Sequence, residues 1–441
     1  MARTPTSAPA KRAVAIPAVI RRNTLLLAAS QAFVGTGNQM IPTLGAIIVV
    51  KLLGSASFAG VGTSILGVSR FIVAYPVGKI TDTYGRKAGV VAGLIVGMAG
   101  AVVTGLSVML SSFALFLVGM LIFGMGVGAA QQLRVAAADM YPTRLRGYGL
   151  GMVLTGSLVG ALGGPLLIRA AQSLSGSAGI DATALAWILV PVFVLPGLFL
   201  VLQVRPDPKE IAANLAQYYP GEKAPAPPST APGQATGGFF TYVRHYPKLS
   251  AFTSMFAVQG TMGMLMAMTP LVLSHHGHGL GAISISVTIH VIGMFGLSLP
   301  LGRLCDRIGR RPVLLAGLLI GAAGGILMPV TAFYWVITAG IFLVGLGWSC
   351  VNVASSALIV DTTGPQERGR AIGANDTFSA ASGIVLPLVG GLVAQYVGLA
   401  AIGVLAVAIT VPPVVLVLRL REPSPGRYES KQTTAAAETR G

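Results

Sequence analysis

Three charged side chains stand within long apolar stretches of the sequence, where a charge is costly and therefore suggests a function. Asp376 is the only acidic residue that we place inside such a stretch, and Arg70 and Arg134 are basic residues in the same setting. A lone carboxylate in apolar surroundings can take up and release a proton, and an arginine can bind an anionic group of a ligand. The alternatives are structural: Asp376 could bond to helix backbone, and the arginines could pair with acids or extend toward the membrane surface.

The composition indicates which elements carry these residues. The chain has 441 residues, of which 54% are hydrophobic and 10% are charged, whereas a soluble domain carries about 25% charged residues. Segments of about 20 apolar residues recur along it and predict membrane-spanning helices. The net charge of +17 comes from lysines and arginines gathered in the N-terminal segment, the C-terminal tail and alternate loops. That distribution is typical of a membrane protein and not of a nucleic-acid-binding surface.

The apolar segments predict an all-α polytopic membrane protein with about twelve transmembrane helices in two six-helix bundles. We expect both termini in the cytoplasm, and the short loops favour a multi-pass protein of a bacterial inner membrane. The predicted parts are an N-terminal arm, a first bundle, a loosely structured linker, a second bundle and a disordered tail, at residues 1–23, 24–204, 205–248, 249–420 and 421–441.

A short polar motif occurs twice and supports a duplication. Residues 78–87 and 302–311 both read G-x-x-x-D-x-x-G-R followed by Lys or Arg, and the two copies are 224 positions apart. A second repeated pair follows each copy: Asp139 precedes Arg146 by seven residues, and Asp361 precedes Arg368 by seven. Two similar halves joined head to tail would place these motifs in equivalent loops.

The repeated motif resembles the loop between helices 2 and 3, and its copy between helices 8 and 9, of the major facilitator superfamily. The resemblance covers the chain from about residue 25 to 420 and implies two pseudo-symmetric bundles that rock about a central site. It also implies a conformational latch on the cytoplasmic side, formed by Asp82, Arg86, Asp139, Asp306, Arg310 and Asp361. The alternative is that these charges only set the topology and anchor helix ends.

The predicted fifth helix carries small residues at regular spacing, including Gly151, Gly160, Gly164 and Pro165. The pattern resembles the G-x8-G-x3-G-P-x3-G signature of antiporters in the same superfamily and favours export. Arg169 stands where that signature has its last glycine. The alternative is that the glycines only let helices approach closely, while the proline opens the local backbone ladder.

Other polar residues become candidates through the same resemblance, because helices 1, 4, 7 and 10 line the central cavity in this family. Asn38, Gln259 and Asn352 would then contact the substrate, and bonds between neighbouring helices are the alternative. His290, in the predicted eighth helix, could protonate within the cavity or could stay neutral and bonded to a neighbour.

These features together predict a secondary transporter that works by alternating access. We expect proton-coupled export of small amphipathic organic compounds. An uptake symporter or uniporter for a small metabolite anion is one alternative, and a lipid flippase without ion coupling is another. The sequence has no G-x-x-x-x-G-K-[S/T] motif for binding nucleoside phosphates and no nucleophile–base set, so we expect neither ATP hydrolysis nor an enzyme.

The expected partners follow from this interpretation. They are a small-molecule substrate, protons as the coupling ion and the lipid bilayer, with no nucleic acid, no cofactor and no metal, and the expected state is a monomer. Three histidines between the predicted helices 7 and 8 are the only metal-like cluster, and their short loop has no cysteine or carboxylate nearby in sequence.

Overall fold

The computed structural model describes residues 16–142, 145–220, 246–329, 331–363 and 368–421. Within these ranges every regular element is helical. Eleven helices are long and apolar enough to cross a membrane, and the number rises to twelve if α13 and α14, which are bent by 41° at their junction, form one span. The all-α polytopic fold predicted from the sequence is therefore confirmed.

The first bundle contains six spans, two of which are interrupted. The first span is interrupted at Gln39 between α1 and α2, and the fourth at Gln131 between α5 and α6. The bounds are α1 (Ala18–Asn38), α2 (Met40–Leu53), the 3-10 turn η1 (Ala56–Phe58), α3 (Val61–Tyr84), α4 (Arg86–Met109), α5 (Phe113–Ala130), α6 (Gln132–Asp139), α7 (Arg146–Ala178) and α8 (Ala182–Leu202).

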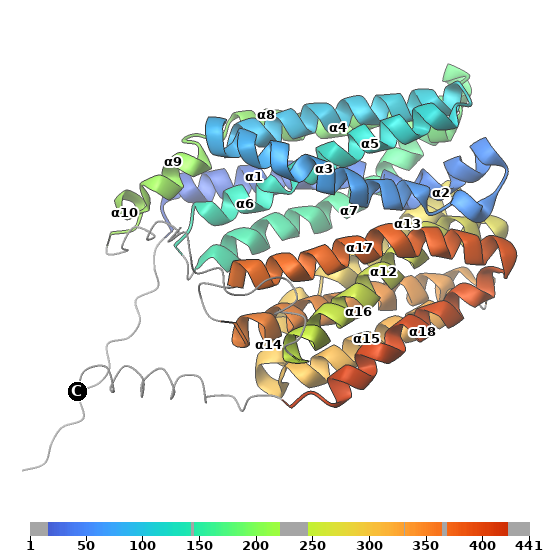
Figure 1. Ribbon diagram of the computed structural model, residues 1–441. Helices are drawn as coiled ribbons and strands as arrows, with labels where there is room; N and C mark the ends of the chain where they lie inside the picture. Colours follow the sequence, from blue (N-terminus) through green and yellow to red (C-terminus); the bar gives the residue numbers. More distant parts are fainter. Residues whose placement is uncertain (1–15, 143–144, 221–245, 330, 364–367, 422–441) are drawn as a thin grey trace, which may run out of the picture.

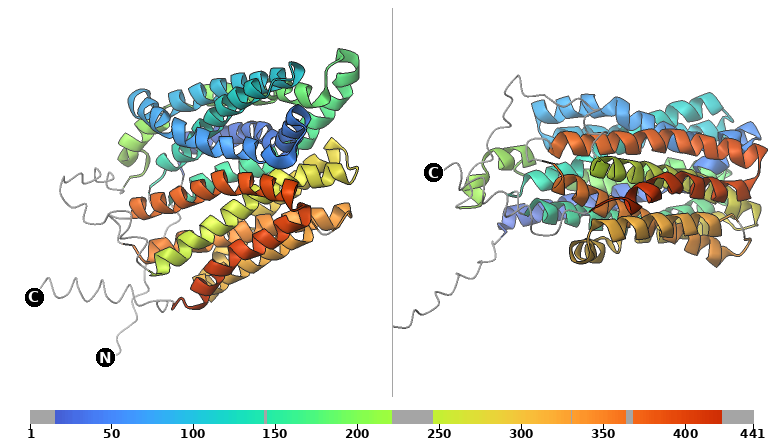
Figure 2. Two further views of the ribbon diagram at one scale, coloured as in Figure 1. Left: turned by 45° about the vertical axis from the view of Figure 1, so that its right-hand side comes forward. Right: turned by 60° about the horizontal axis from the view of Figure 1, so that its bottom comes forward.

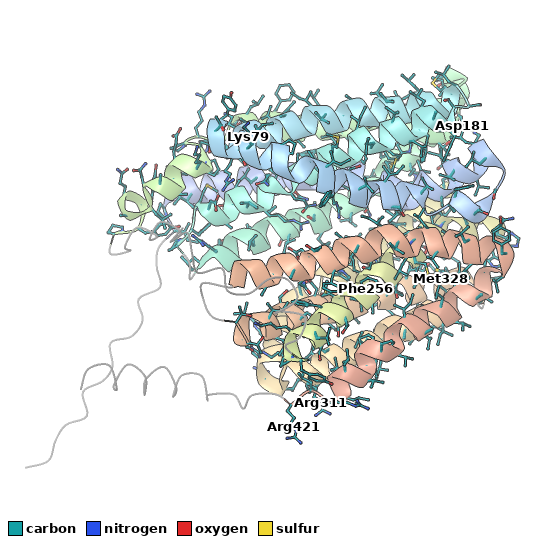
Figure 3. All side chains as sticks on the ribbon, in the orientation of Figure 1. Lys79, Asp181, Phe256, Arg311, Met328 and Arg421 are labelled. Atoms are coloured by element: carbon teal, nitrogen blue, oxygen red, sulfur yellow. The ribbon has the colours of Figure 1, made fainter. Side chains whose placement is uncertain are left out.

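The second bundle repeats this order. Its helices are α12 (Tyr246–His275), α13 (Leu280–Phe295), α14 (Ser298–Ile308), α15 (Arg310–Leu327), α16 (Tyr334–Asp361), α17 (Arg368–Tyr396) and α18 (Leu399–Leu418). Figures 1 and 2 show the two bundles side by side, with the described ends of the chain at the same end of the molecule. Figure 3 shows Lys79 at that terminal end of the first bundle and Asp181 at the opposite, distal end.

Two segments are more ordered than the sequence suggested. The first helix begins at Ala18 and not near residue 24, because Ile20 and Asn23 are fully buried in the bundle. The linker begins with two short helices, α9 (Pro208–Ala213) and α10 (Leu215–Tyr218), whose Ile211 and Leu215 are buried. These apolar side chains dock the start of the linker on the terminal end of the first bundle, next to α4 and α6.

Glycines allow the helices of one bundle to approach closely. On α7, a side-chain carbon added at Gly156 would lie 2.0 Å from the Ala28 carbonyl oxygen of α1, and one added at Gly160 would lie 2.3 Å from that of Ala32. Such distances leave no room for a side chain, so van der Waals packing between small residues joins α1 and α7.

The two bundles contact each other toward the distal end. The Ser64 hydroxyl on α3 donates to the Ile384 carbonyl on α17 (2.7 Å), and the Ala56 amide donates to Oε1 of Gln395 (3.0 Å). Nearer the termini on the same two helices, Gly78 and Gly373 have open space where a side chain would project. The described contacts therefore join α3 and α17 distally and not at these two terminal positions.

Candidate functional site

Arg70 lies on the face of α3 that meets the second bundle. Thr63, seven residues earlier, has its methyl group 3.9 Å from a side-chain carbon built at Gly263 of α12. Gly67, three residues earlier, packs against Ile384 of α17. Because residues three and seven apart share one face of an α-helix, the exposed Arg70 side chain projects into the space between the bundles.

Arg134, on α6, stands six residues after Gly128 of α5 in the same interrupted span. The stem of Arg70 packs against α5 at Gly128. The Nε atom of Arg134 is buried and has no hydrogen-bond partner in the described part of the chain. No described carboxylate pairs with either arginine, so this side of the first bundle carries two cations that a bound anion would stabilise.

Asp376 is exposed on α17, on the face directed at the first bundle and α12. Gly383, seven residues later, faces the Gln259 amide, and Pro387, eleven residues later, contacts both Gly60, the N-cap of α3, and Gly263 of α12. The helical period places Asp376 on the same face as these two residues. Its carboxylate has no hydrogen bond or ion pair with any described side chain and is available to a proton or a ligand.

Arg70 and Asp376 lie at similar depths. Ser64 and Ile384 are hydrogen-bonded and give a common reference level on α3 and α17. Arg70 is six residues from Ser64, about 9 Å along α3, and Asp376 is eight residues from Ile384, about 12 Å along α17. Both distances run toward the terminal end. The two walls therefore present opposite charges to the same part of the interbundle space.

The second bundle adds an anchored aromatic side chain. The Trp348 indole on α16 donates its Nε1–H to Oε1 of Gln259 on α12 (2.8 Å). The Phe295 ring stands edge-on to Trp348, with centroids 6.0 Å apart and planes at 77°. Gln259 is one turn from Gly263, the position that approaches Thr63 of the first bundle, so this group lies beside the distal contact between the bundles.

The remaining predicted cavity residues have different surroundings. Asn352 is half-buried one turn after Trp348 on α16, on the same side of that helix. His290 is 2% exposed, and its Nδ1 lies 2.7 Å from the Ile341 carbonyl oxygen, so it bonds α13 to α16 within the second bundle. Asn38 lines a small apolar pocket among α1, α4, α5 and α8, inside the first bundle.

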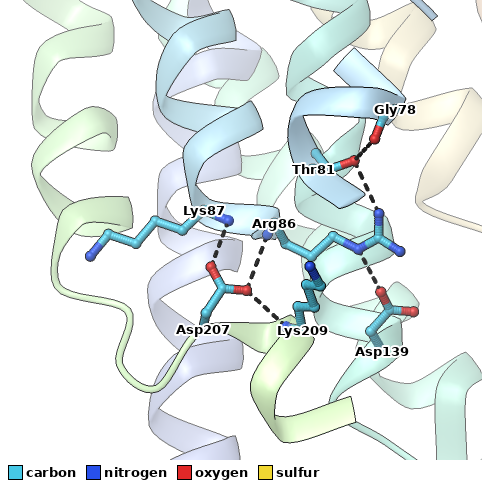
Figure 4. Close-up of polar contacts among 7 residues, drawn as sticks. All are labelled: Gly78, Thr81, Arg86, Lys87, Asp139, Asp207 and Lys209. Atoms are coloured by element: carbon cyan, nitrogen blue, oxygen red, sulfur yellow. Dashed lines mark hydrogen bonds and ion pairs between the residues drawn. The ribbon is translucent and has the colours of Figure 1, made fainter. Parts of the chain in front are cut away.

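The loop motif of the first bundle is held by charge-assisted hydrogen bonds (Figure 4). Arg86 donates from Nε to Oδ2 of Asp139 (2.8 Å) and from Nη1 to the Thr81 hydroxyl (3.1 Å). Asp207, at the start of the linker, accepts from the backbone N–H groups of Arg86 and Lys87, both at 3.0 Å. A carboxylate at this position caps the N-terminus of α4 and complements its dipole.

The motif of the second bundle has a similar ion pair. Arg310 donates from Nε to Oδ2 of Asp361 (2.8 Å), and its Nη1 lies 3.2 Å from Oδ1 of Asp306. The side chain of Asp82, the counterpart of Asp306, lies outside the described residues. Each predicted loop arginine therefore pairs with the acid that ends the fourth span of its own bundle, and the latch role stays a prediction.

The glycine-rich face of α7 serves two contacts. Gly160 packs on α1, while Gly164 faces both Gln39 and Ser284 of α13; Gly151 has open space beside it. Pro165 lies inside α7 and has no N–H to donate to the carbonyl of Ala161 four residues earlier. That carbonyl instead accepts a hydrogen bond from the Thr288 hydroxyl of α13 (2.8 Å). The proline therefore provides an acceptor for the contact between the bundles.

At the distal end, Asp181 joins two helices of the first bundle. It accepts from Lys51 Nζ (2.6 Å) and from the Thr183 amide (2.9 Å), which makes it the N-cap of α8. Burial by itself raises the pKa of Asp181, but the hydrogen bonds from Lys51 and Thr183 and the Lys51 charge outweigh it. The pKa therefore lies below its ordinary value, and the carboxylate is ionised at neutral pH.

Comparison with known proteins identifies the family. The sequence matches the Major Facilitator Superfamily over residues 27–284 and 249–440. The chain belongs to this superfamily. It is 29% identical over 413 residues to the uncharacterized MFS-type transporter YdeG of Bacillus subtilis (strain 168), covering 90% of this chain and 91% of the relative. The family is one of transporters, as predicted, and the fold with two bundles is the fold of its members.

Two further similarities agree with the superfamily assignment. The chain is 24% identical over 361 residues to the riboflavin transporter RfnT of Brucella anthropi, covering 81% of this chain and 85% of the relative. A bacterial homolog of the human lysosomal transporter Spinster, solved in an inward-facing and unoccupied conformation, has the same fold with a TM-score of 0.63 and 15% identity. The match covers 92% of this chain and 96% of that chain.

The sequence did not point to two residues that make specific contacts in the structure, Trp348 and Asp207. Trp348 gave no signal because a tryptophan in an apolar helix is ordinary, and only the partner Gln259 was a candidate. Asp207 stands in a segment expected to be loose. The dipeptide Asp207-Pro208 is the signal that could have been used, because an acid followed by proline is typical of a helix N-cap and first position.

Proposed function

We propose that this chain is a proton-coupled secondary transporter of a small organic anion and that it works by alternating access. The observation that carries the proposal is the placement of Arg70 and Arg134 opposite Asp376 in the interbundle space. The arginines would bind the anion, and Asp376 would bind the proton. An anion near Asp376 stabilises its protonated form, so substrate and proton would occupy the site together. Joint binding favours symport, which an inward proton gradient would drive as uptake.

The proposed cycle uses the distal contact as one gate. The hydrogen bonds Ser64–Ile384 and Thr288–Ala161 would break when the bundles rock and the distal end opens. The terminal end would then close, and the Arg86–Asp139 and Arg310–Asp361 pairs would position the loop motifs for that closure. The predicted latch thus remains part of the proposed mechanism, with each pair holding a loop of its own bundle.

We propose further that the terminal end faces the cytoplasm of a bacterial cell. Basic residues gather there, with Lys79 and Arg311 as examples, and positive loops face the cytoplasm in membrane proteins. The conformation described would then be open inward. Each chain carries both bundles and all the residues of the proposed site, so we propose that one chain is a complete transporter.

A second candidate is export of small amphipathic compounds by proton exchange. The glycine-rich face of α7 favours it, because Pro165 and Gly164 lie at the contact with α13 and the pattern resembles the antiporter signature. A cationic or neutral compound would displace the proton from Asp376 and would not need the arginines. The two candidates therefore differ in the sign of the proton movement that a substrate causes.

The test uses purified protein in proteoliposomes that contain a pH-sensitive dye, with the membrane potential clamped. The probes are naphthalene-2-sulfonate and ethidium, an amphipathic cation. Naphthalene-2-sulfonate stays anionic at every pH used. It therefore does not diffuse through lipid in a protonated form, as a weak acid does. Each is added in turn to one side. We expect naphthalene-2-sulfonate to enter together with protons and to acidify the lumen.

The variants sharpen the assay. Arg70→Gln and Arg134→Gln should reduce anion-dependent acidification by at least tenfold, since each removes a charge-assisted bond worth about 1.5–3 kcal/mol. Asp376→Asn should abolish the proton signal. Arg169→Gln, a basic residue on the same bundle outside the proposed site, is the matched control. Proton release by ethidium with no response to the anion would reject symport in favour of export, and a response to neither probe would reject proton coupling.

A further inference from the structure

Trp348, which Gln259 anchors on α16, has no role in the proton and charge chemistry described so far. Trp348 is half-buried in α16, and its only polar atom is already bonded to Gln259. Phe295 holds the ring from the side by an edge-to-face contact. An indole with its N–H satisfied and its ring fixed presents a rigid π-surface at little cost in conformational entropy.

The helix rise gives the depth of Gln259, the partner of Trp348, relative to Arg70. Thr63 and Gly263 approach each other across the bundles and give a common level. Gln259 is four residues from Gly263, about 6 Å along α12, and Arg70 is seven residues from Thr63, about 10.5 Å along α3. The difference in depth is about 4.5 Å. The Trp348–Gln259 pair and Arg70 therefore lie at neighbouring depths of the interbundle space.

We propose that Trp348, held by Gln259 and Phe295, is the subsite for a planar conjugated ring, so that the substrate is an aromatic or heteroaromatic organic acid. The acidic group binds Arg70 and Arg134 from the first bundle, and the ring packs against Trp348 from the second. The ligand then touches both bundles, and its release accompanies their relative movement. This inference rests on the proposed transport of an anion and names the class of anion.

The chemistry of the site favours a ring over an alkyl chain. Aromatic pairs gain stabilisation beyond the apolar area that they bury, and a flat ring also fits beside an arginine guanidinium by stacking. A saturated ring of the same size buries similar area but lacks the quadrupole. The structure therefore predicts discrimination between two acids that differ only in the unsaturation of the ring.

The experiment measures binding to the full chain in detergent by isothermal titration calorimetry and by thermal shift. The probes are benzenesulfonate, cyclohexanesulfonate and benzenesulfonamide, which separate the contribution of the ring from that of the charge. We expect benzenesulfonate to bind roughly three- to tenfold more tightly than cyclohexanesulfonate, the ratio expected for one aromatic pair. Benzenesulfonamide should bind more weakly than benzenesulfonate because it has no charge for the arginines.

Variants assign the discrimination to Trp348. Trp348→Ala should make benzenesulfonate and cyclohexanesulfonate bind equally, while Trp348→Phe should keep most of the preference. Trp335→Ala, at a tryptophan that is 61% exposed on the same helix, is the matched control and should change nothing. Each variant must unfold at a temperature similar to that of the parent. Trp348→Phe, which keeps an aromatic ring, shows whether a loss of binding preference in Trp348→Ala comes from misfolding alone.

Failure of this inference is distinguishable from failure of the proposed function. Equal binding of the two sulfonates to the parent, with both lost in Arg70→Gln, overturns the ring subsite and leaves anion transport intact. A preference for the aromatic probe that survives in Trp348→Ala also overturns it. Loss of any dependence on Arg70, with benzenesulfonamide binding as well as benzenesulfonate, contradicts the anion itself and therefore both proposals.

Discussion

The loops that open α4 and α15 show how far the two bundles are equivalent. In both, a glycine with positive φ precedes the arginine: Gly85 has φ +99° and Gly309 has φ +97°. Lys87 donates to the Leu202 carbonyl at the end of α8 (2.7 Å), and Arg311 donates to the Leu418 carbonyl at the end of α18 (2.6 Å). The duplicated motif therefore produces duplicated backbone geometry and duplicated side-chain bonds.

The difference lies in two carboxylates of the first bundle. Asp207 caps α4, and 216 positions later, the offset that relates Leu202 to Leu418, the sequence has Pro423. Asp181 caps α8, whereas the N-cap of α18 is Gly398, which has no side chain to accept a bond. The repeat fixes the shared arginine–aspartate pairs, and acids outside the repeated motif cap helix ends in the first bundle. The first bundle should therefore depend on carboxylates in ways that the second does not.

The largest expected effect comes from substituting the two loop glycines. Alanine at either position adopts a backbone conformation that costs about 1–3 kcal/mol. In Gly85→Ala the added carbon would also lie 2.6 Å from Oδ2 of Asp207, which should displace the cap at a further cost of about 1 kcal/mol. Thermal unfolding in detergent should therefore give a lower Tm for Gly85→Ala than for Gly309→Ala.

A double variant separates the two contributions. Adding Asp207→Ala to Gly85→Ala should cost little more, because the cap is already displaced, while adding it to Gly309→Ala should cost the full amount. Additive losses in both backgrounds would show that Gly85 and Asp207 act independently, and the described contact would then have no energetic role.

A smaller effect is expected when the linker cap alone is removed. Asp207→Ala should destabilise the first bundle by about 1 kcal/mol, since the backbone N–H groups of Arg86 and Lys87 lose their acceptor. Docking of the linker should weaken with it. Limited proteolysis with trypsin, which cleaves after Lys209, should become faster in Asp207→Ala and remain at the parent rate in the exposed control Glu210→Ala. Unchanged cleavage would mean that Ile211 and Leu215 hold the linker without the cap.

The smallest effect concerns pH and the distal cap. Because the pKa of Asp181 is lowered, its carboxylate contributes fully to folding stability at pH values above its ordinary pKa of 3.8. That contribution is lost as the pH falls through the lowered pKa. Asp181→Asn should thus lower the stability at pH 7 by at most about 1 kcal/mol, because the pair with Lys51 is exposed. The parent and Asp181→Asn should converge in Tm at strongly acidic pH. A difference that persists there would assign the effect to packing and not to charge.

The sequence was sufficient for the architecture because the relevant signals are local. Apolar length predicts spans, and the repeated motif predicts two similar halves; both predictions are confirmed by the helices and by the superfamily match. The sequence was less accurate about where the first helix begins. The first helix was expected to start near residue 24 because Arg21 and Arg22 are polar, yet these two side chains lie exposed on a helix whose other face, with Ile20 and Asn23, is buried.

The residues of the candidate site were predicted with different success. Arg70, Arg134 and Asp376 were chosen because charges in apolar helices are costly, and that rule needs no knowledge of neighbours. Asn38 was chosen because it lies in helix 1 and His290 because it can be protonated, and neither reason says which way a side chain points. A rotation of 100° per residue decides whether a polar group faces the other bundle or its own. Asn38 and His290 both have their described neighbours within their own bundle.

The sequence by itself determined that this protein spans a membrane, that it consists of two related bundles and that ionisable groups stand within its helices. Each of these follows from hydrophobicity and repetition along the chain. Only the tertiary structure decided which helix faces carry the charges, that Gln259 and Phe295 hold Trp348, and that Asp207 reaches back to cap α4. Those facts depend on the rotation and packing of helices far apart in sequence, and packing free energy is summed over the whole bundle and not over any one segment.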